Sequence, residues 1–245
     1  MKILITGMNG TVAPVLAKTL ISSGYAISSW NRSQVPIDDT AQIENFIATE
    51  QPDIFFHVAT GPAEWAEKVA QVCAQQNIKF LFTSSVSVYS NTQQGPFSVD
   101  IEPVPNDDYG RYKLECERRV MGVNPSAWLV RLGWQIGTTM AGNHMVAHLE
   151  QAYQQDGSVE ASTQWYPGCS FLEDTAAGIK AIVENQPAGV YHLGGNPGLT
   201  YFEIVTHLKE TLERPWEVRP TTAFVYNNRL VDGRFQSNSI SDRFN

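Results

Sequence analysis

Cysteine is scarce in this sequence, which has only three cysteines in 245 residues. Cys73, Cys116 and Cys169 are odd in number and form no CxxC pair. The count therefore indicates neither a disulfide framework nor a zinc site built from thiolates. Unpaired thiols fit a reducing compartment.

Basic residues and long apolar runs are also few. Seventeen Lys and Arg stand against twenty-five Asp and Glu, a formal net charge of -8. Because nucleic-acid binding depends on clustered basic residues, we expect no nucleic-acid partner. The apolar run at residues 1–5 is too short for a signal peptide, and no later run approaches the roughly 18 residues of a membrane span. We expect a cytoplasmic protein without membrane contact.

What the sequence does contain is a regular alternation of short apolar runs and helical patterns. With 42% hydrophobic residues, the chain can bury a large core. The first half predicts strands at 3–5, 25–30, 54–58 and 78–83, separated by helices at 12–20, after Asp38 or Asp39, and at 63–76. This alternation predicts an α/β fold: a doubly wound parallel sheet of the Rossmann type, with helices on both faces.

The second half is less regular. It predicts helices at 107–121, 143–155, 174–184 and 201–212, and strands at 127–132 and 190–193. We expect a dinucleotide-binding domain at 1–137, to which 171–195 returns, and a small discontinuous substrate-binding region at 138–170 and 196–245. The polar tail after Asn227 is either an extended segment lying over a site or partly disordered.

A glycine-rich turn follows the first strand and opens the first helix. Gly7, Gly10 and Ala13 form a GxxGxxA pattern, with Asn9, Thr11 and Val12 between them. Glycines at these positions permit a tight turn and close approach of a pyrophosphate, while the helix N-terminus offers free N–H groups. The pattern predicts dinucleotide binding; an ordinary strand-to-helix turn is the alternative.

The end of the second strand bears on the choice of dinucleotide. It reads Asn31-Arg32-Ser33 and has no carboxylate to bind a ribose 2′-hydroxyl. A guanidinium flanked by amide and hydroxyl groups suits a 2′-phosphate. The sequence therefore favours NADP(H) over NAD(H), with Arg32 as a solvated loop charge as the alternative.

Two segments carry groups suited to acid–base chemistry. Tyr109 and Lys113 stand four residues apart on an expected helix, so they share one face. A nearby ammonium and a cationic nicotinamide ring would lower the pKa of the phenol towards neutrality, which suits proton exchange with a carbonyl or hydroxyl. Tyr112 competes with Tyr109 but has Cys116, not Lys, four residues on. The hydroxyl-rich run 83–89 follows a strand and lies at the ligand-binding edge of such a sheet.

Together these segments resemble the extended branch of the short-chain dehydrogenase/reductase superfamily, the NAD(P)-dependent epimerases and dehydratases. The glycine turn, His57-Val58-Ala59, the run 84–89 and the Tyr109/Lys113 pair occur in that family's order and spacing. The resemblance implies that Ser85, Tyr109 and Lys113 form a catalytic triad. It also implies further cofactor contacts at Ile37, Val58, Ala59, Thr60 and Leu132, besides Tyr109 and Lys113 themselves.

Among the branches of the superfamily, the compact length and the Arg/Ser-rich tail most resemble the dTDP-4-dehydrorhamnose reductase group. The chain departs from the family pattern in three ways. Pro36-Ile37 replaces an adenine-binding Asp, so only backbone contact is expected there. The stretch between Ala59 and Ser84 is short. The arginine that would bind a substrate pyrophosphate has four candidates: Arg214, Arg219, Arg229 and Arg234.

Other residues with possible binding chemistry are better explained structurally. His144 and His148 have metal-ligand spacing, but no third ligand joins them, so we expect a solvated helix face and no metal. Tryptophans 128, 134, 165 and 216 are expected in the core or in a pocket wall, with a stacking role open for Trp134 and Trp165.

Three functions remain open on the sequence. The first is an NADP(H)-dependent reductase of a sugar keto group, the sugar being nucleotide-linked, in which Tyr109 protonates the oxygen, Ser85 holds it, and Lys113 anchors the ribose. The second is a nucleotide-sugar epimerase or dehydratase with tightly bound NAD. The third is a non-catalytic NADP-binding regulatory protein. A homodimer is a family expectation.

Overall fold

A six-stranded parallel sheet forms the centre of the protein. The computed structural model describes residues 1–140 and 142–244. The strands are β1 (Lys2–Ile5), β2 (Ala26–Ser29), β3 (Ile54–His57), β4 (Lys79–Ser85), β5 (Trp128–Leu132) and β10 (Gly189–Leu193). They lie in the order β10-β5-β4-β3-β1-β2. Because the chain steps outward from β1 to β2 and then back past β1 to β3, β1 and β3 form the topological switch point.

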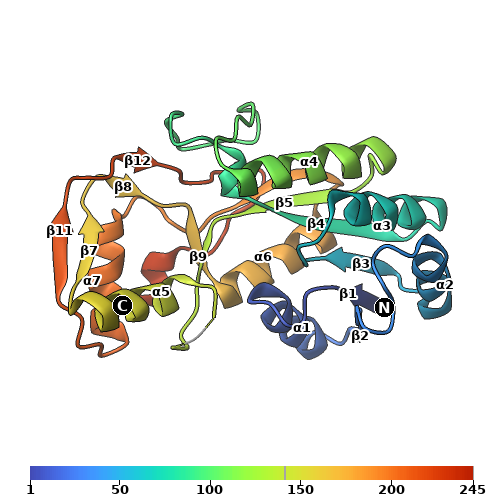
Figure 1. Ribbon diagram of the computed structural model, residues 1–245, viewed down its shortest axis with the longest axis horizontal. Helices are drawn as coiled ribbons and strands as arrows, with labels where there is room; N and C mark the ends of the chain where they lie inside the picture. Colours follow the sequence, from blue (N-terminus) through green and yellow to red (C-terminus); the bar gives the residue numbers. More distant parts are fainter. Residues whose placement is uncertain (141, 245) are drawn as a thin grey trace.

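Helices cover both faces of this sheet (Figure 1). Helices α1 (Val12–Ser22) and α6 (Leu172–Asn185) lie on one face, and α2 (Thr40–Glu50), α3 (Ala63–Gln75) and α4 (Asp108–Val123) on the other. Burial from both sides explains why β3 and β5 are apolar runs rather than alternating sequences. The expected doubly wound Rossmann fold is confirmed.

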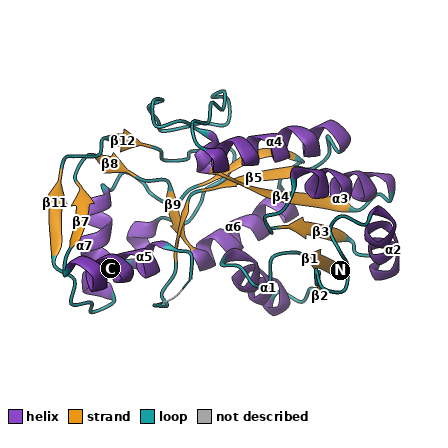
Figure 2. Cartoon of the chain, viewed as in Figure 1, coloured by secondary structure: helices purple, strands orange, loops and turns teal. Residues whose placement is uncertain are grey.

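A second region, at the left of the molecule in Figure 2, consists of small sheets and two helices. Its strands pair two by two: β6 (Trp134–Ile136) with β9 (Cys169–Phe171), β7 (Val159–Ser162) with β11 (Val218–Thr221), and β8 (Trp165–Tyr166) with β12 (Tyr226–Asn227). Helices α5 (Met145–Asp156) and α7 (Tyr201–Thr211) pack around a separate core that includes Trp216 and Ile204. The division into a dinucleotide domain and a substrate region stays a prediction.

The polar tail after Asn227 is an extended segment that runs back to the central sheet. Leu230 forms a parallel bridge with Phe97, and Asp232 accepts a hydrogen bond from the backbone of His192 in β10 (3.2 Å). The chain then ends in the 3₁₀ helix η2 (Ile240–Arg243), where Arg243 pairs with Asp174 at the start of α6 (2.8 Å). The first of the two alternatives for the tail, an extended segment, is therefore what the structure shows.

None of the helices within the described residues has the length and apolar character that crossing a membrane requires.

Candidate active site

The glycine turn lies at the switch point, against the loop that follows β3. Gly7 has φ +90°, and a Cβ there would lie 3.0 Å from the backbone nitrogen of Ala59. The hydroxyl of Thr6 accepts hydrogen bonds from the N–H groups of both Val58 and Ala59, each at 3.0 Å. Thr6 was not among the residues expected from the sequence, although a hydroxyl directly before the glycine turn was a usable signal.

The turn fits a pyrophosphate. The N–H of Gly10 donates to the carbonyl of Gly7 (2.8 Å), so the chain reverses tightly before α1. Thr11, at the N-cap of α1, makes no side-chain capping bond within the described part of the chain, and the first turn carries no acidic residue. Unfilled N–H groups and the positive end of a helix dipole favour a bound anion. Asn9, Gly10 and Thr11 are all at least partly exposed at this point.

Arg32 and Thr60, which the sequence placed on separate cofactor-contacting segments, meet in the structure. The Arg32 guanidinium donates to the carbonyl of Thr60 and lies over the ring of Trp65, 4.8 Å from its centre. Asn31 folds the same loop, because its Oδ1 accepts from both the N–H (3.0 Å) and the hydroxyl (2.8 Å) of Ser33. The loop thus presents a guanidinium beside the end of β3.

Ser85, Tyr109 and Lys113 gather at the carboxyl end of β4. Ser85 ends β4, opposite Leu132 of β5, and its hydroxyl lies 3.2 Å from the hydroxyl of Ser87 and near the phenol of Tyr109. Tyr109 lies in the first turn of α4 and is 47% exposed. Lys113 is 2% exposed and its ammonium donates to the carbonyl of Thr83 (2.9 Å). The ammonium is 5.9 Å from the centre of the Tyr109 ring.

Burial dominates the electrostatics of this group. Burial raises the pKa of Tyr109 above its ordinary value, and the hydrogen bond with Ser85 opposes the rise. Burial also lowers the pKa of Lys113, to about 8. The ammonium is directed to the carbonyl of Thr83 rather than to the phenol. The acidic phenol, which was expected from the ammonium and a cationic nicotinamide ring together, stays a prediction.

Tyr112 differs from Tyr109 because its hydroxyl is hydrogen-bonded to the loop after β3. Its hydroxyl accepts a hydrogen bond from the N–H of Gly61 (3.1 Å), and burial raises its pKa to about 12. The bond ties α4 to the loop after β3, so Tyr112 has a structural use that Tyr109 lacks.

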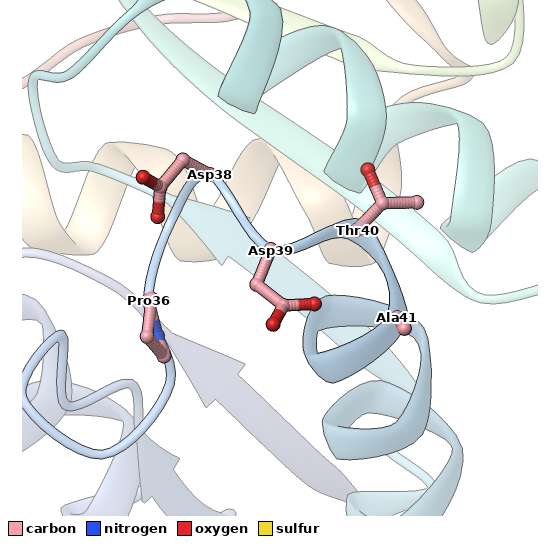
Figure 3. Close-up of a pocket in the computed structure, with 5 residues that line it drawn as sticks. All are labelled: Pro36, Asp38, Asp39, Thr40 and Ala41. Atoms are coloured by element: carbon pink, nitrogen blue, oxygen red, sulfur yellow. The ribbon is translucent and has the colours of Figure 1, made fainter.

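The loop between β2 and α2 borders an open depression lined by Pro36, Asp38, Asp39, Thr40 and Ala41 (Figure 3). Asp39 caps α2 by accepting from the N–H of Gln42 (3.0 Å). This lining holds carboxylates and no basic side chain, so it does not suit a phosphate. Ile37 is partly buried against the core formed with α2 and α3.

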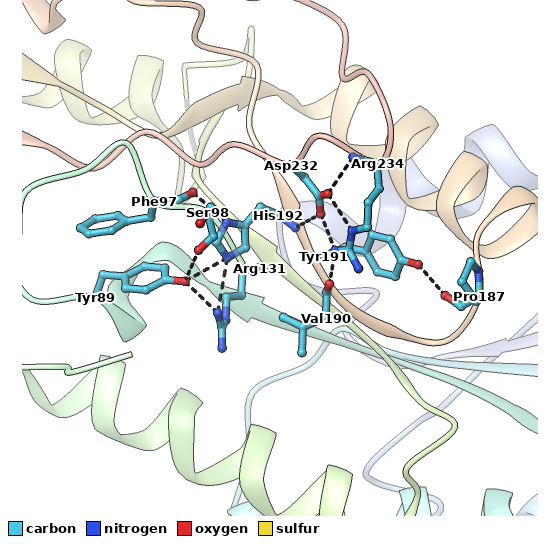
Figure 4. A network of polar contacts seen from close by, with 10 residues as sticks. All are labelled: Tyr89, Phe97, Ser98, Arg131, Pro187, Val190, Tyr191, His192, Asp232 and Arg234. Carbon is cyan, nitrogen blue, oxygen red and sulfur yellow. Dashed lines mark hydrogen bonds and ion pairs between the residues drawn. The ribbon is translucent and has the colours of Figure 1, made fainter. Parts of the chain in front are cut away.

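A buried polar network supports the segment that follows Ser85 (Figure 4). Arg131 of β5 pairs with Glu117 of α4 (2.7 Å) and donates to the hydroxyl of Tyr89 (2.8 Å). That hydroxyl lies 3.1 Å from Nε2 of His192, while Nδ1 of the same ring lies 3.0 Å from the carbonyl of Phe97. The Phe97 carbonyl requires the proton on Nδ1, so Nε2 accepts. None of these residues stood out in the sequence as a network, because they come from five distant segments.

The expectation of a solvated helix face for His144 is wrong. His144 is 2% exposed and is the N-cap of α5, where Nδ1 accepts from the N–H of Ala147 (3.3 Å). Only His148 is exposed, and its ring contacts Trp134 (5.6 Å between centres). Within residues 1–140 and 142–244, no group of three or more His, Cys, Asp or Glu could hold a metal.

The four candidate arginines and the tryptophans lie in different surroundings. Arg219 pairs with Glu217, Arg234 pairs with Asp232, and the Nε of Arg214 is buried without a partner in the described chain. Arg229 donates to the carbonyl of Pro197 (2.6 Å). Trp128 and Trp216 are core residues, as expected. Trp134 and Trp165 form a partly buried stack, 6.0 Å between centres.

A Rossmann sheet with a glycine turn at its switch point, and with Ser, Tyr and Lys at the end of the fourth strand, defines the extended short-chain dehydrogenase/reductase class of NAD(P)-dependent proteins. Within this class, the sequence profile described as the RmlD substrate binding domain matches residues 1–64 and 62–231. The chain belongs to the RmlD substrate-binding domain family.

Individual relatives agree with this assignment. A dTDP-4-dehydrorhamnose reductase from Streptomyces griseus is 24% identical over 95% of this chain and 83% of its own length. Methionine adenosyltransferase 2 subunit beta from Xenopus tropicalis is 23% identical over 89% of this chain and 75% of its own length. The crystal structure of dTDP-4-dehydrorhamnose reductase from Bacillus anthracis in complex with NADP superposes with a TM-score of 0.84 at 18% identity, covering 99% of this chain and 96% of that one.

Proposed function

We propose that the protein is an NADP(H)-dependent oxidoreductase that reduces a keto group of a nucleotide-linked sugar. The observation that carries the proposal is the convergence of Ser85, Tyr109 and Lys113 at the same edge of the sheet as the glycine turn. Membership of the RmlD family and the similarity to dTDP-4-dehydrorhamnose reductases support the reaction and the substrate class.

In this proposal the cofactor supplies the hydride and the side chains supply position and a proton. The hydroxyl of Ser85 holds the substrate oxygen by a hydrogen bond, and the neighbouring hydroxyl of Tyr109 gives that oxygen its proton. Lys113, whose ammonium donates to the carbonyl of Thr83 here, would hold the cofactor ribose, and its charge would lower the pKa of Tyr109. The glycine turn and α1 bind the pyrophosphate.

Tyr109→Phe tests the acid. It should lower the rate of NADPH oxidation with a keto sugar nucleotide by at least about 100-fold, because general acid catalysis contributes that much. The dissociation constant for NADPH should change by less than about twofold, since Phe keeps the ring of Tyr109 and the other expected cofactor contacts are unchanged. The matched control is Tyr112→Phe, one turn of the same helix away, which should keep most of its activity. Full activity of Tyr109→Phe would refute the assignment.

Arg32→Ala tests the cofactor preference. The variant should lose affinity for NADPH about tenfold or more, since it removes a charge-assisted contact, and should bind NADH as the wild type does. Fluorescence titration with each cofactor measures both constants. Equal losses for NADH and NADPH, or none, would show that Arg32 does not recognise a 2′-phosphate.

A second candidate, a regulatory subunit that binds NADP without turnover, has one observation in its favour, the similarity to methionine adenosyltransferase 2 subunit beta. An epimerase or dehydratase with tightly held NAD is the other alternative in the same fold. One measurement separates the three: a reductase consumes NADPH in proportion to product, an epimerase or dehydratase consumes none while converting substrate, and a regulatory subunit converts nothing.

A further inference from the structure

Trp65 of α3 lies directly beneath the only guanidinium on the β2 loop. Trp65 is 2% exposed, whereas Arg32 lies at the surface, with its guanidinium carbon 4.8 Å from the centre of the indole ring. That separation falls within the range in which a cation is attracted to an aromatic face. The ring and the carbonyl of Thr60 hold the guanidinium from two directions.

The close approach of these groups depends on Gly61. A Cβ at Gly61 would lie 2.7 Å from Cε3 of the indole and 3.6 Å from a terminal nitrogen of Arg32. Any larger side chain there would displace the indole, which is held rigidly in the core. The absence of a side chain at 61 therefore leaves the indole face open to Arg32.

The same indole supports the base of the loop that carries Arg32. Its ring packs edge-on against Trp30 (5.7 Å between centres) and against His57 (4.4 Å). Trp30 directly follows β2, and its Nε1 donates to the carbonyl of Val35 (3.0 Å), which closes the turn 31–35. The indole nitrogen of Trp65 has no hydrogen-bond partner in the described residues, so the face and edges of the ring, not its N–H, make its contacts.

We propose that Trp65 is a positioning residue for 2′-phosphate recognition: it holds the guanidinium of Arg32 in place before the cofactor arrives, so that NADP(H) binding does not have to order a free arginine. The inference rests on the proposed use of NADP(H). An arginine side chain loses rotamer entropy when it is fixed, and prior ordering reduces that cost at binding.

The test compares 2′,5′-ADP with 5′-ADP by calorimetric titration, so that neither hydride transfer nor substrate is needed. Trp65→Leu should weaken 2′,5′-ADP binding about three- to tenfold and leave 5′-ADP binding within about twofold of wild type. Trp65→Phe keeps an aromatic face and should restore most of the loss. The matched control is Trp128→Leu, which removes another buried indole that lies near a cation, Lys79 (5.9 Å), and should change neither constant.

A measurement on the free wild-type protein does not depend on the folding of any variant. The δ protons of Arg32, assigned by comparison with Arg32→Lys, should resonate upfield because they lie near the indole face. The absence of that shift would overturn the inference. So would an equal loss of both nucleotides in Trp65→Leu, or no loss of 2′,5′-ADP binding.

The two proposals fail in different ways. If Arg32→Ala binds 2′,5′-ADP as wild type does, the proposed NADP(H) preference fails. If Arg32→Ala weakens 2′,5′-ADP binding while Trp65→Leu does not, the cofactor preference stands and the positioning role of Trp65 is wrong.

Discussion

At the residue scale, the ion pair between Glu117 and Arg131 is the most isolated from water. Both side chains are about 5% exposed, and the guanidinium makes two hydrogen bonds to the carboxylate (2.7 and 3.0 Å). Removal of one partner of such a pair leaves an uncompensated buried charge. The pair joins α4, which carries Tyr109 and Lys113, to β5, so it also fixes the helix that holds the proposed acid.

Glu117→Gln should therefore lower the free energy of unfolding by about 3 kcal/mol. The double variant Glu117→Leu/Arg131→Met, which removes both charges, should be less destabilised than Glu117→Gln, because no charge stays buried alone. Denaturation in urea measures both. If the double variant is the less stable of the two, the pair stabilises this fold beyond the cost of burying its charges.

At the element scale, α4 packs closely against the segment after Ser85 at Gly110. A Cβ at Gly110 would lie 2.0 Å from the backbone carbonyl oxygen of Ser87, and this oxygen belongs to the 3₁₀ helix η1 (Val86–Val88). The missing side chain lets the N-terminus of α4 approach β4, which places Tyr109 beside Ser85. The spacing of acid and hydroxyl thus depends on helix packing.

Two glycines of the same helix give opposite predictions. Gly110→Ala should push α4 away from η1, reduce turnover by at least about tenfold and lower the free energy of unfolding by about 1–3 kcal/mol. Gly122→Ala, whose Cβ would meet nothing described within 4 Å, should raise the free energy of unfolding by about 0.5–1 kcal/mol and leave turnover unchanged. Steady-state kinetics and thermal melting on the two variants measure this contrast. Wild-type turnover in Gly110→Ala would show that the contact does not set the geometry of the site.

Elements also differ in how far the sequence predicts them. The central strands were predictable because strands buried on both faces read as short apolar runs, as β3 does with its residues 54–57. The small sheets were not, since β8 has only two residues and β11 contains Pro220, and such strands depend on distant partners rather than on local pattern. For the same reason the meeting of Arg32 with Trp65 could not be derived from sequence spacing.

At the scale of the whole molecule, two buried histidines link stability to pH. Burial lowers the pKa of His57 to about 3 and that of His192 to about 4, from an ordinary value of 6.5. Below pH 6.5 the unfolded chain binds protons that the folded chain excludes. The two histidines therefore do not lower the free energy of unfolding above about pH 6.5. As the pH falls from there towards 4, the free energy of unfolding decreases.

Each histidine should contribute a slope of up to about 1.4 kcal/mol per pH unit between pH 6.5 and 4. Denaturation of the wild type at pH 6.5, 5.5 and 5.0, above the range where most carboxylates titrate, measures the slope. His57→Asn should reduce this slope by the contribution of one histidine, up to about 1.4 kcal/mol per pH unit, whatever its effect on the free energy of unfolding at pH 7. An identical slope in the variant would mean that His57 is not excluded from protonation in the folded protein.

The tail that crosses from β12 to η2 has a consequence for synthesis. Three residues of this tail hold it in place. Leu230 forms a bridge with Phe97, Asp232 accepts a hydrogen bond from the backbone of His192, and Arg243 pairs with Asp174. During translation residues 230–243 emerge after β10 and α6, so β10 and the start of α6 stay incompletely covered until this segment follows them. A bulky fusion at the C-terminus would delay or crowd that closing step, whereas one before Met1, which is 61% exposed, would not.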